Sequence, residues 1–376
     1  MPERRSRRRS AGPVPATIRD VARVSKVSIA TVSRVFNDST LVSGTTRQRV
    51  LASASRLGYW PNGIARSLIT SRTHTLGVLM PDLHGEFFSE VIHGLDLKAR
   101  ERGFHILVSR SSSTAEELTA ALRSMRGRVD GLIVMAPALD QAEAIGPLLG
   151  DLPTVLLNPE GGSAGCDSIA IANRDGARAM VRHLIRVGHR HIALITGPTD
   201  NIDSRQRLEG YQAAIRESDA EAAEDLVSVG DFGERSGYDA AVKILERTPR
   251  PTAVFAANDY MAVGVIGALA DAGLSVPEDM AVVGFDDIPL ARYLTPPLTT
   301  VHVDMLRLGE RAVDLLLERH SPGATDGATH GTSDGPRQEI LPTTLVVRGS
   351  CGSRPPGAGE SGGRWNRIHP ARGSRH

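Results

Sequence analysis

The sequence is poor in cysteine and in long apolar runs, and each shortage excludes a class of protein. Its 376 residues include two cysteines, Cys166 and Cys351, which is too few for a disulfide framework or a four-cysteine zinc site. The apolar stretch at 261–270 is shorter than the roughly 18 residues of a membrane span and contains two glycines. The Arg-rich start is followed by Gly and Pro, not by the apolar segment of a signal peptide. These features predict a cytoplasmic protein with no membrane partner.

A strong net charge is also missing, because opposite charges in different segments cancel. The formal net charge is +1. Residues 1–72 carry 14 Lys and Arg against 3 Asp and Glu, a net of +11, whereas residues 73–348 carry 25 against 39, a net of −14. Residues 349–376 carry 5 against 1, a net of +4. A basic head on an acidic body is typical of a protein that docks one end on nucleic-acid phosphates, although a general preference for arginine over lysine is an alternative cause.

The length and the 40% hydrophobic content predict two or three domains with buried cores. Residues 1–16 are rich in Arg, Ser, Pro and Gly and predict a flexible arm, and 17–71 predict short helices. From residue 75 short apolar runs alternate with amphipathic segments, which predicts βαβ units around buried parallel sheets. The predicted strands are 76–80, 106–108, 131–135, 154–157, 191–195, 226–229, 253–256 and 281–285. The predicted helices are 86–102, 114–126, 141–149, 203–216, 235–246 and 260–272.

Two such α/β units in series predict two lobes with a cleft between them. Ligands of these sheets bind at the carboxyl ends of the strands, so residues directly after strands are the candidates for a site. The composition of 321–338 predicts a loop, and that of 349–376 predicts a disordered tail.

The basic head has the spacing of a helix-turn-helix. A capping hydroxyl at Thr17 opens one apolar-periodic segment, and a second segment begins at residue 28 after a short interruption. Val32 and Val35 are predicted to face the core. An outward arginine can pair with guanine and small apolar groups can contact thymine methyls. The residues predicted to project outward on the second helix are Ile29, Ala30, Ser33 and Arg34.

Short polar side chains near this helix suit phosphate contacts; they are Ser28, Thr31 and Asn37. An ordinary small helical bundle with solvated arginines is the alternative interpretation of the same pattern.

The head closely resembles the DNA-binding headpiece of the lactose/galactose repressor (LacI/GalR) family. The resemblance is carried by 17–22, 27–35 with Asn37, 42–47, 58–62 and 65–68. It departs at the turn, where the family usually has Ala-Gly and this chain has Ser25 and Lys26. Because glycine adopts positive φ at little cost, either Lys26 is left-handed or the turn differs in shape. The further DNA-contacting positions that the resemblance implies are Thr17, Ser43, Thr46, Tyr59, Asn62, Ala65 and Leu68.

The resemblance also implies a hinge helix at 62–68 that becomes ordered on operator DNA. Leu68 would enter the minor groove as an apolar wedge, which unstacks a base step and bends the duplex. The alternative is that Ile64 and Leu68 form an i, i+4 pair packed on the body.

The resemblance extends over nearly all of 17–348 and implies a two-lobed, periplasmic-binding-protein-like (type I) core. It is carried by 77–82, 87–88, 188–193, 205–211, 257–259, 283–287 and 296–301. By matching position, Arg207, Asn258 and Asp286 are polar effector contacts, with Arg205 a weaker candidate. Helices within 88–102 and 262–272 are candidates for a homodimer interface.

Phe87 and Phe88 occupy the place of an aromatic pair in the cleft. Together with the polar residues they suit a carbohydrate effector, since a carboxylate accepts from hydroxyls and an aromatic ring covers an apolar sugar face. The alternatives are a structural ion pair between Arg207 and Asp286 across the lobes, and core positions for both phenylalanines. Gly85-Glu86 stands where the family often has Asn-Pro, and Ala172 stands at an often acidic position.

Taken together, these patterns predict six segments. They are an arm at 1–16, a headpiece at 17–61, a hinge at 62–72, a first lobe at 73–172 plus about 302–320, a second lobe at 173–301 plus about 338–348, and a tail at 349–376.

Enzyme motifs are weak by comparison. Residues 161–165 match G-x-S-x-G around Ser163, but a nucleophile elbow needs a helix after the motif and 167–171 look like a strand. Neither a Walker A loop, nor a dinucleotide-binding glycine motif, nor a zincin motif occurs in the sequence. We therefore expect no enzymatic activity, no cofactor and no metal site.

The sequence predicts a cytoplasmic, nucleoid-associated transcriptional repressor that acts as a homodimer, or a higher oligomer, on pseudopalindromic double-stranded operator DNA. A small-molecule effector, a sugar or related metabolite, would control it from the cleft. A solute-binding protein without DNA function is the alternative, and the basic head argues against it.

Overall fold

The computed structural model describes residues 16–36, 41–59, 72–110, 115–135, 149–159, 165–218, 220, 226–318 and 335–352. The chain divides into two compact units, Met1–Thr73 and His74–His376. Each unit has its own core.

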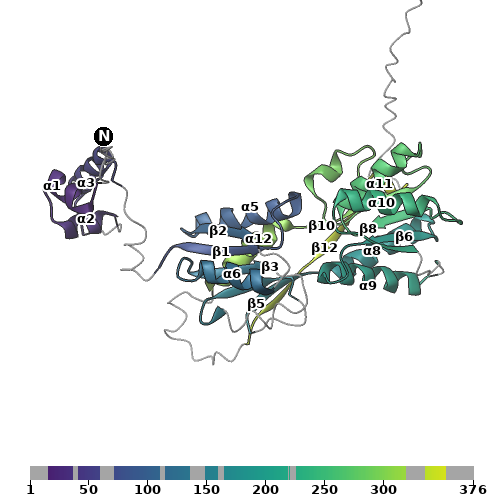
Figure 1. Ribbon diagram of the computed structural model, residues 1–376, viewed down its shortest axis with the longest axis horizontal. Helices are drawn as coiled ribbons and strands as arrows, with labels where there is room; N and C mark the ends of the chain where they lie inside the picture. Colours follow the sequence, from purple (N-terminus) through teal and green to yellow (C-terminus); the bar gives the residue numbers. More distant parts are fainter. Residues whose placement is uncertain are drawn as a thin grey trace, which may run out of the picture. The chain divides into compact units, whose positions relative to one another are not determined.

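The first unit is a three-helix bundle, drawn in purple in Figure 1. It consists of α1 (Ile18–Ser25), α2 (Ile29–Phe36) and α3 (Gly44–Leu57). Val32 and Val35 are 0% and 1% exposed and pack with Val21, Val50 and Ala54. The prediction that Val32 and Val35 face the core is therefore confirmed.

The turn between α1 and α2 is built on Lys26. This residue has φ 54° and ψ 46°, the left-handed region, and its N–H bonds to the carbonyls of Ala22 and Arg23. Ser25 is buried and its Oγ donates to the Val21 carbonyl at 2.6 Å. The chain therefore keeps the left-handed turn geometry with a lysine in the place where glycine is usual.

The second unit begins with a lobe built on a six-stranded parallel sheet of order β11-β5-β4-β3-β1-β2. Alternate side chains of each strand face opposite layers. Val78 packs with residues of α5 and α12 on one face, and Leu79 packs with residues of α6 on the other. Figure 1 shows α5 and α6 on opposite sides of this sheet. The strands are β1 (Thr75–Met80), β2 (His105–Arg110), β3 (Gly131–Met135), β4 (Thr154–Leu157), β5 (Asp167–Ile171) and β11 (Gln338–Leu341). The helices are α5 (Glu86–Glu101), α6 (Ala115–Met125) and α12 (Met305–Glu318).

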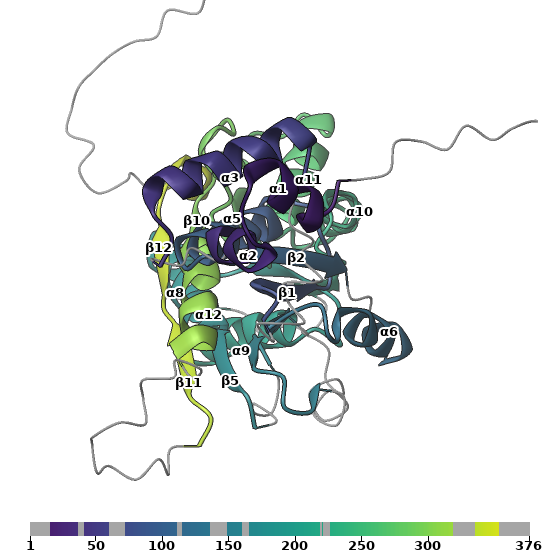
Figure 2. The same cartoon turned by 90° about the vertical axis from the view of Figure 1, so that its left-hand side faces the viewer.

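Helix α12 comes late in the chain but lies along this first sheet, beside β5 in Figure 2. It packs closely against α5, where Gly94 and Gly309 bring the two backbones together.

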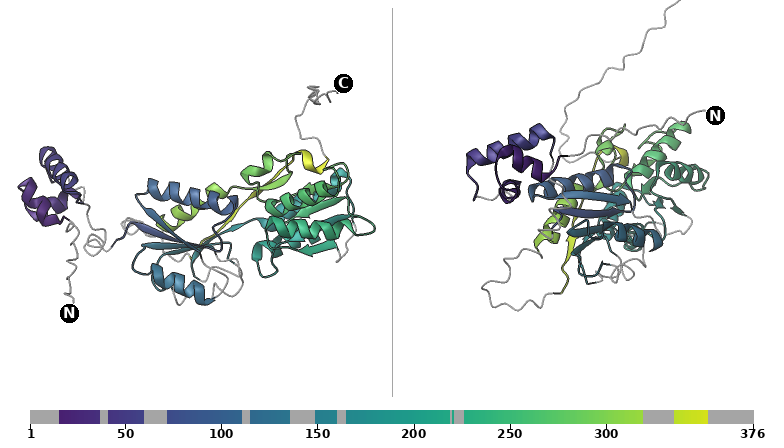
Figure 3. Two further views of the ribbon diagram at one scale, coloured as in Figure 1. Left: turned by 45° about the horizontal axis from the view of Figure 1, so that its top comes forward. Right: turned by 60° about the vertical axis from the view of Figure 1, so that its left-hand side comes forward.

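The second lobe has a four-stranded parallel sheet of order β7-β6-β8-β9. Helices α8 and α9 pack as a pair on one face, and α10 and α11 pack as a pair on the other (Figure 3). The strands are β6 (Ile192–Thr196), β7 (Val227–Val229), β8 (Ala253–Ala256) and β9 (Ala281–Val283). The helices are α8 (Asn173–Val187), α9 (Ile202–Arg216), α10 (Glu234–Leu245), α11 (Asp259–Asp271) and the short 3-10 helices η2 (Pro289–Arg292) and η3 (Gly349–Cys351).

The chain passes between the lobes three times. It crosses between β5 and α8, along β10 (Thr300–Val303) toward α12, and back from β11 along β12 (Thr343–Val346). The strands β10 and β12 pair with each other in antiparallel register.

One predicted assignment is wrong. Residues from about 338 were expected in the second lobe, yet β11 pairs with β5 in the sheet of the first lobe. Only the segment after β11 returns to the second lobe. Strand β11 adds to the edge of this sheet beside β5. Pairing between segments so far apart in the chain cannot be predicted from local sequence patterns.

The observed strands differ from the predicted ones mainly at their ends. The strand predicted over 281–285 ends at Val283, and the residues after it form the cleft loop described below. The predicted helix over 141–149 and the Gly-rich motif around Ser163 lie almost wholly outside the described residues. The strand expected after that motif is present as β5. A nucleophile elbow would need a helix at this position.

Candidate functional site

The outward face of α2 is the candidate nucleic-acid surface. Ile29 is 46% exposed, and Ala30 and Arg34 are exposed beside it. Ser33 is partly buried. An exposed isoleucine next to an exposed arginine on a short helix suits contact with the major-groove edges of bases.

Two of the predicted DNA-contacting hydroxyls, Thr17 and Ser28, cap helices. Thr17 caps α1 in a capping box with Asp20, and the Ser28 hydroxyl accepts from the N–H of Thr31 at 3.1 Å, at the start of α2. At the start of α3, the Ser43 hydroxyl donates to Thr46 Oγ1 at 3.0 Å. These bonds fix the helix ends at which backbone N–H groups can bind an anion.

Tyr59 packs against Phe36 in the headpiece core, with ring centroids 5.7 Å apart. Burial raises the pKa of its hydroxyl. The remaining predicted DNA contacts, Asn37, Asn62, Ala65 and Leu68, lie outside the described residues.

A cavity of about 510 Å³ lies between the two lobes of the second unit. Its walls come from loops that follow β1, β7, β8 and β9 and from the first turns of α5, α9, α10 and α11. This is the carboxyl-end location expected for parallel sheets. The lining residues that the sequence predicted are Phe87, Phe88, Arg207, Asn258 and Asp286.

Arg207 is the centre of the polar wall. It is 3% exposed; its Nε donates to Asn173 Oδ1 at 2.9 Å, and its Nη1 donates to the carbonyl of Ala257. Its Nη2 lies 3.0 Å from Asp286 Oδ1, and the guanidinium carbon lies 3.8 Å from the centroid of the Phe285 ring. Stacking and hydrogen bonds therefore hold the guanidinium in one orientation.

Asp286 follows β9 with φ 108°, a conformation that is rare for a residue with a side chain. Among the described residues its Oδ1 has no hydrogen-bond donor of good geometry, although it pairs with Arg207. Burial raises its pKa to about 6, against the opposing charge of Arg207. The carboxylate therefore retains capacity to accept a hydrogen bond from a ligand hydroxyl.

Asp203, which the sequence did not single out, is a second carboxylate beside Arg207. Its Oδ1 accepts from Asn173 at 2.7 Å and from Asn158 at 3.1 Å. Burial raises its pKa, while Arg207 and the two amides oppose that rise.

Asn258 has a structural task in the cleft. Its Oδ1 accepts from the N–H of Met261 and caps α11, and its Nδ2 donates to the carbonyl of Phe232 at 2.9 Å. Phe232 has φ 70°, and its ring covers Gly197 so closely that a Cβ there would overlap it. Phe232 is thus a cleft aromatic that sequence reasoning missed, because its place depends on packing between distant segments.

Arg205 is not among the lining residues of the cavity; its Nη1 donates to the carbonyl of Thr199 at 3.2 Å. The Arg207–Asp286 pair, considered above as a link across the lobes, lies wholly within the second lobe, on α9 and after β9. Further lining residues that the sequence did not identify are Asp82, His84, Met135, Asp231, Glu234 and Tyr260.

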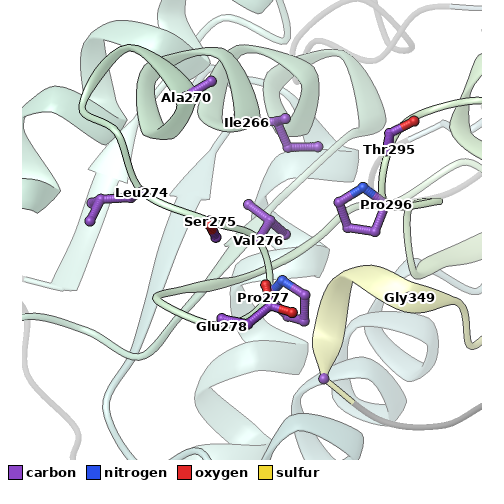
Figure 4. Close-up of a pocket in the computed structure, with 11 residues that line it drawn as sticks. Ile266, Ala270, Leu274, Ser275, Val276, Pro277, Glu278, Thr295, Pro296 and Gly349 are labelled. Atoms are coloured by element: carbon purple, nitrogen blue, oxygen red, sulfur yellow. The ribbon is translucent and has the colours of Figure 1, made fainter. Parts of the chain in front are cut away.

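A second cavity, of about 630 Å³, lies at the far end of α11 (Figure 4). Its lining is mostly aliphatic and proline side chains, including Ile266, Pro277 and Pro296. Among the described residues, Glu278 is the one charged residue of this lining. It lacks the converging polar groups of the cleft, so the cleft is the better ligand site.

Within the described segments, no three His, Cys, Asp or Glu residues gather as a metal site would require. Among the helices that the structure describes, none is long and apolar enough to cross a membrane.

A helix-turn-helix unit joined to a two-lobed core with a ligand-sized cleft defines a DNA-binding transcriptional regulator that responds to a small molecule. Residues 17–62 match the family model of bacterial regulatory proteins of the lacI family, and residues 181–351 match a periplasmic binding protein-like domain. The ribose operon repressor of Escherichia coli (strain K12) is 37% identical over 338 residues, which cover 89% of this chain and 100% of that protein. The chain therefore belongs to the lacI family.

Other similar proteins agree with this assignment. The repressor PurR of Haemophilus influenzae (strain PittEE) is 36% identical over 344 residues, 90% of this chain and 99% of that protein. The structure of the Lac repressor dimer bound to operator and the anti-inducer ONPF has a TM-score of 0.79 at 32% identity and covers 90% of this chain and 99% of its own. The CelR–cellobiose complex has a TM-score of 0.66 at 32% identity, covering 89% and 99%.

Proposed function

We propose that this repressor acts in the cytoplasm as a homodimer on a pseudopalindromic operator, releases or binds it in response to a carbohydrate in the cleft, and catalyses no reaction. The observation that carries this proposal is the combination in one chain of an exposed recognition helix with a polar, aromatic-lined cleft. A solute-binding protein does not need a recognition helix, and a DNA-binding protein without an effector does not need a ligand cleft.

The headpiece residues that would read bases are Ile29, Ala30 and Arg34, all exposed on α2. The first turns of α2 and α3 contain no acidic residue, so the positive ends of both helix dipoles are open to DNA phosphates. Ser28, Thr31, Ser33, Ser43 and Thr46 would position the headpiece on the backbone, and Leu68 would act as the minor-groove wedge.

The effector would bind between Asp286, Arg207 and the aromatic rings of Phe87, Phe88 and Phe232. Two structures support a sugar: the CelR complex contains cellobiose, and a family member from Enterococcus faecium, with a TM-score of 0.63 at 27% identity, has bound ribose. A ligand that binds one arrangement of the lobes better than another shifts that equilibrium, and through it the operator affinity.

A two-fold dimer would place two headpieces on two half-sites. Leu97 on α5 is 45% exposed. An exposed apolar side chain there supports an interface on α5, and we propose α5, together with α11 as the second predicted helix, for the dimer contact. The limits of arm, headpiece and hinge stay as predicted, and β11 moves to the first lobe. The tail, predicted to begin at 349, begins later, because η3 (Gly349–Cys351) is buried against the second lobe.

Replacing Arg34 by Ala tests base reading. The variant should lose about 1–3 kcal/mol of affinity for its preferred operator and discriminate less at one base pair. Fluorescence anisotropy with operator and random duplexes measures both effects, with Arg56→Ala on α3 as the control. Unchanged affinities of Arg34→Ala for both duplexes would disprove the reading role.

Deleting residues 1–72 tests the wider proposal. Filter binding should show that the shortened chain no longer binds DNA, while its thermal stabilisation by an effector sugar is retained. Equal DNA binding by the intact and shortened chains would mean that the headpiece does not bind DNA specifically. The solute-binding alternative would then be favoured.

A further inference from the structure

The cleft is strongly acidic. Among the residues that the structure describes, five carboxylates and one arginine line it. The carboxylates belong to Asp82, Asp203, Asp231, Glu234 and Asp286. His84 also lines it, with its Nδ1 3.1 Å from Asp82 Oδ1. The described lining includes no lysine.

The single arginine is already paired. Arg207 directs Nη2 to Asp286, Nη1 to the carbonyl of Ala257 and Nε to Asn173. Asp203 lies close enough for Arg207 to oppose the rise of its pKa. An anionic ligand would therefore meet a cation whose charge is already compensated.

The positive N-terminal ends of the helices around the cleft are also neutralised by nearby carboxylates. The first turns of α5, α9, α10 and α11 reach the cavity, and helix N-termini usually bind anions through free N–H groups and the helix dipole. Each of these four first turns contains its own carboxylate. They are Glu86, Asp203, Glu234 and Asp259.

The sequence adds no positive charge in the three undescribed segments that follow strands of the first lobe. The segments 111–114, 136–148 and 160–164 follow β2, β3 and β4, and their sequences contain no lysine and no arginine. Three acidic residues occur in them, Asp140, Glu143 and Glu160.

We propose that the cleft selects its effector by charge: it accepts an uncharged or amine-bearing polyol and excludes phosphorylated or carboxylated ligands. This inference rests on the proposed carbohydrate effector and narrows it. Asp231 lies just before α10 and Glu234 lies in its first turn. These two residues set the selectivity, because both line the cavity and, within the described part of the chain, neither pairs with a lysine or an arginine. Hydroxyls and ammonium groups donate to carboxylates, whereas the negative charge of a phosphate group is repelled by them.

Calorimetric titration of the intact chain with matched ligands tests the selectivity. The pairs are D-ribose with D-ribose 5-phosphate, and D-glucose with D-glucosamine and D-glucose 6-phosphate. Each phosphate ester should bind at least about tenfold more weakly than its parent sugar, and the amine should bind at least as tightly as the sugar. An ester that binds as tightly as its parent sugar would overturn the proposal.

A second titration separates this inference from the carbohydrate proposal, since its probe is inorganic phosphate alone. Glu234→Lys removes the carboxylate at the start of α10 and adds an ammonium, so it should bind phosphate at least about tenfold more tightly than the parent. Glu278→Lys makes the same charge change at the distant cavity of Figure 4 and is the control. Equal phosphate affinity of the parent and Glu234→Lys would overturn the charge inference. If no sugar binds, but Glu234→Lys still binds phosphate more tightly than the parent, the result would count against the carbohydrate effector only.

Discussion

At the scale of single residues, the cleft concentrates unfavourable conformations and charges. Asp286 and Asp287 are consecutive non-glycine residues with positive φ, and Asp286 is a buried carboxylate with one ionic partner. Such strain and burial persist only where the surrounding structure enforces them, and they are frequent at ligand sites. The left-handed Lys26 in the headpiece has no comparable ligand role; it is the cost of closing the helix-turn-helix turn without glycine.

The raised pKa of Asp286 predicts a pH dependence of stability. Burial raises this pKa from 3.8 to about 6, so between these values the folded state binds more protons than the unfolded state. The free energy of unfolding contributed by this group is therefore largest at low pH and falls as pH rises toward 6, by up to about 3 kcal/mol. Urea denaturation of the parent and Asp286→Asn across pH 4–7 should show the parent-minus-variant difference decreasing up to about pH 6 and then levelling. A difference that increases with pH would mean that Arg207 dominates and lowers this pKa.

Lys26→Gly should stabilise the headpiece by about 1 kcal/mol, because glycine accepts the left-handed conformation without a Cβ penalty. Gly58 ends α3 with φ 61° and open space around it. Gly58→Ala should therefore destabilise the headpiece by a similar amount. Hydrogen exchange of headpiece peptides in the intact chain measures both changes. Slower exchange in Gly58→Ala than in Lys26→Gly would contradict the argument.

At the scale of elements, the start of α5 joins the lobes. The backbone N–H of Glu86 donates to the Tyr260 hydroxyl at 2.8 Å, and the Glu86 carboxylate accepts from the N–H of Leu290 at 3.0 Å. Gly85 has φ 90°, and a Cβ there would lie 3.1 Å from the Tyr260 ring. The Gly85-Glu86 pair, which departs from the usual sequence of the family, therefore makes contacts from the first lobe to α11 and η2 of the second.

Tyr260→Phe removes the acceptor of the Glu86 N–H and should favour separated lobes. One lost hydrogen bond of about 1 kcal/mol corresponds to a roughly fivefold shift between lobe arrangements. Single-molecule energy transfer between dyes on the two lobes measures the shift. Tyr238→Phe is the matched control, because its hydroxyl donates to Asp271 inside the second lobe. An equal shift in both variants would indicate a general loosening of the fold.

At the scale of the whole molecule, the two units differ in the charges at their helix N-termini, so one favours anions and the other disfavours them. The basic headpiece leaves the first turns of α2 and α3 free of acidic residues, whereas every helix that begins at the cleft carries one. The total charge is near neutral because a net of +11 in residues 1–72 is offset by a net of −14 in residues 73–348. The acidic body would be repelled by the phosphates that attract the head, which favours docking with the headpiece first.

Removing residues 2–15 deletes five arginines and should reduce the salt dependence of operator binding. If each headpiece loses one or two phosphate contacts, the slope of log affinity against log salt should become shallower by about 1–2 per headpiece. Operator titrations between 50 and 200 mM salt measure the slope. An unchanged slope would mean that the arm makes no phosphate contacts.

Local sequence patterns determined most of the secondary structure and the division of roles. Buried parallel strands are continuous apolar runs, so β1, β3, β4 and β8 were predicted nearly to the residue, and the capping hydroxyl of Thr17 marked the start of α1. The headpiece motif pointed to DNA, and matching positions identified Arg207, Asn258 and Asp286 at the cleft.

Only the tertiary structure decided what depends on segments far apart in the chain. The pairing of β11 with β5, the placement of Phe232 against Gly197 and the contact of Glu86 with Tyr260 each join residues that no local pattern relates. The same holds for charge selection in the cleft. Its carboxylates are scattered from Asp82 to Asp286, and they act together because parallel strands end, and the following helices begin, at one edge of each sheet.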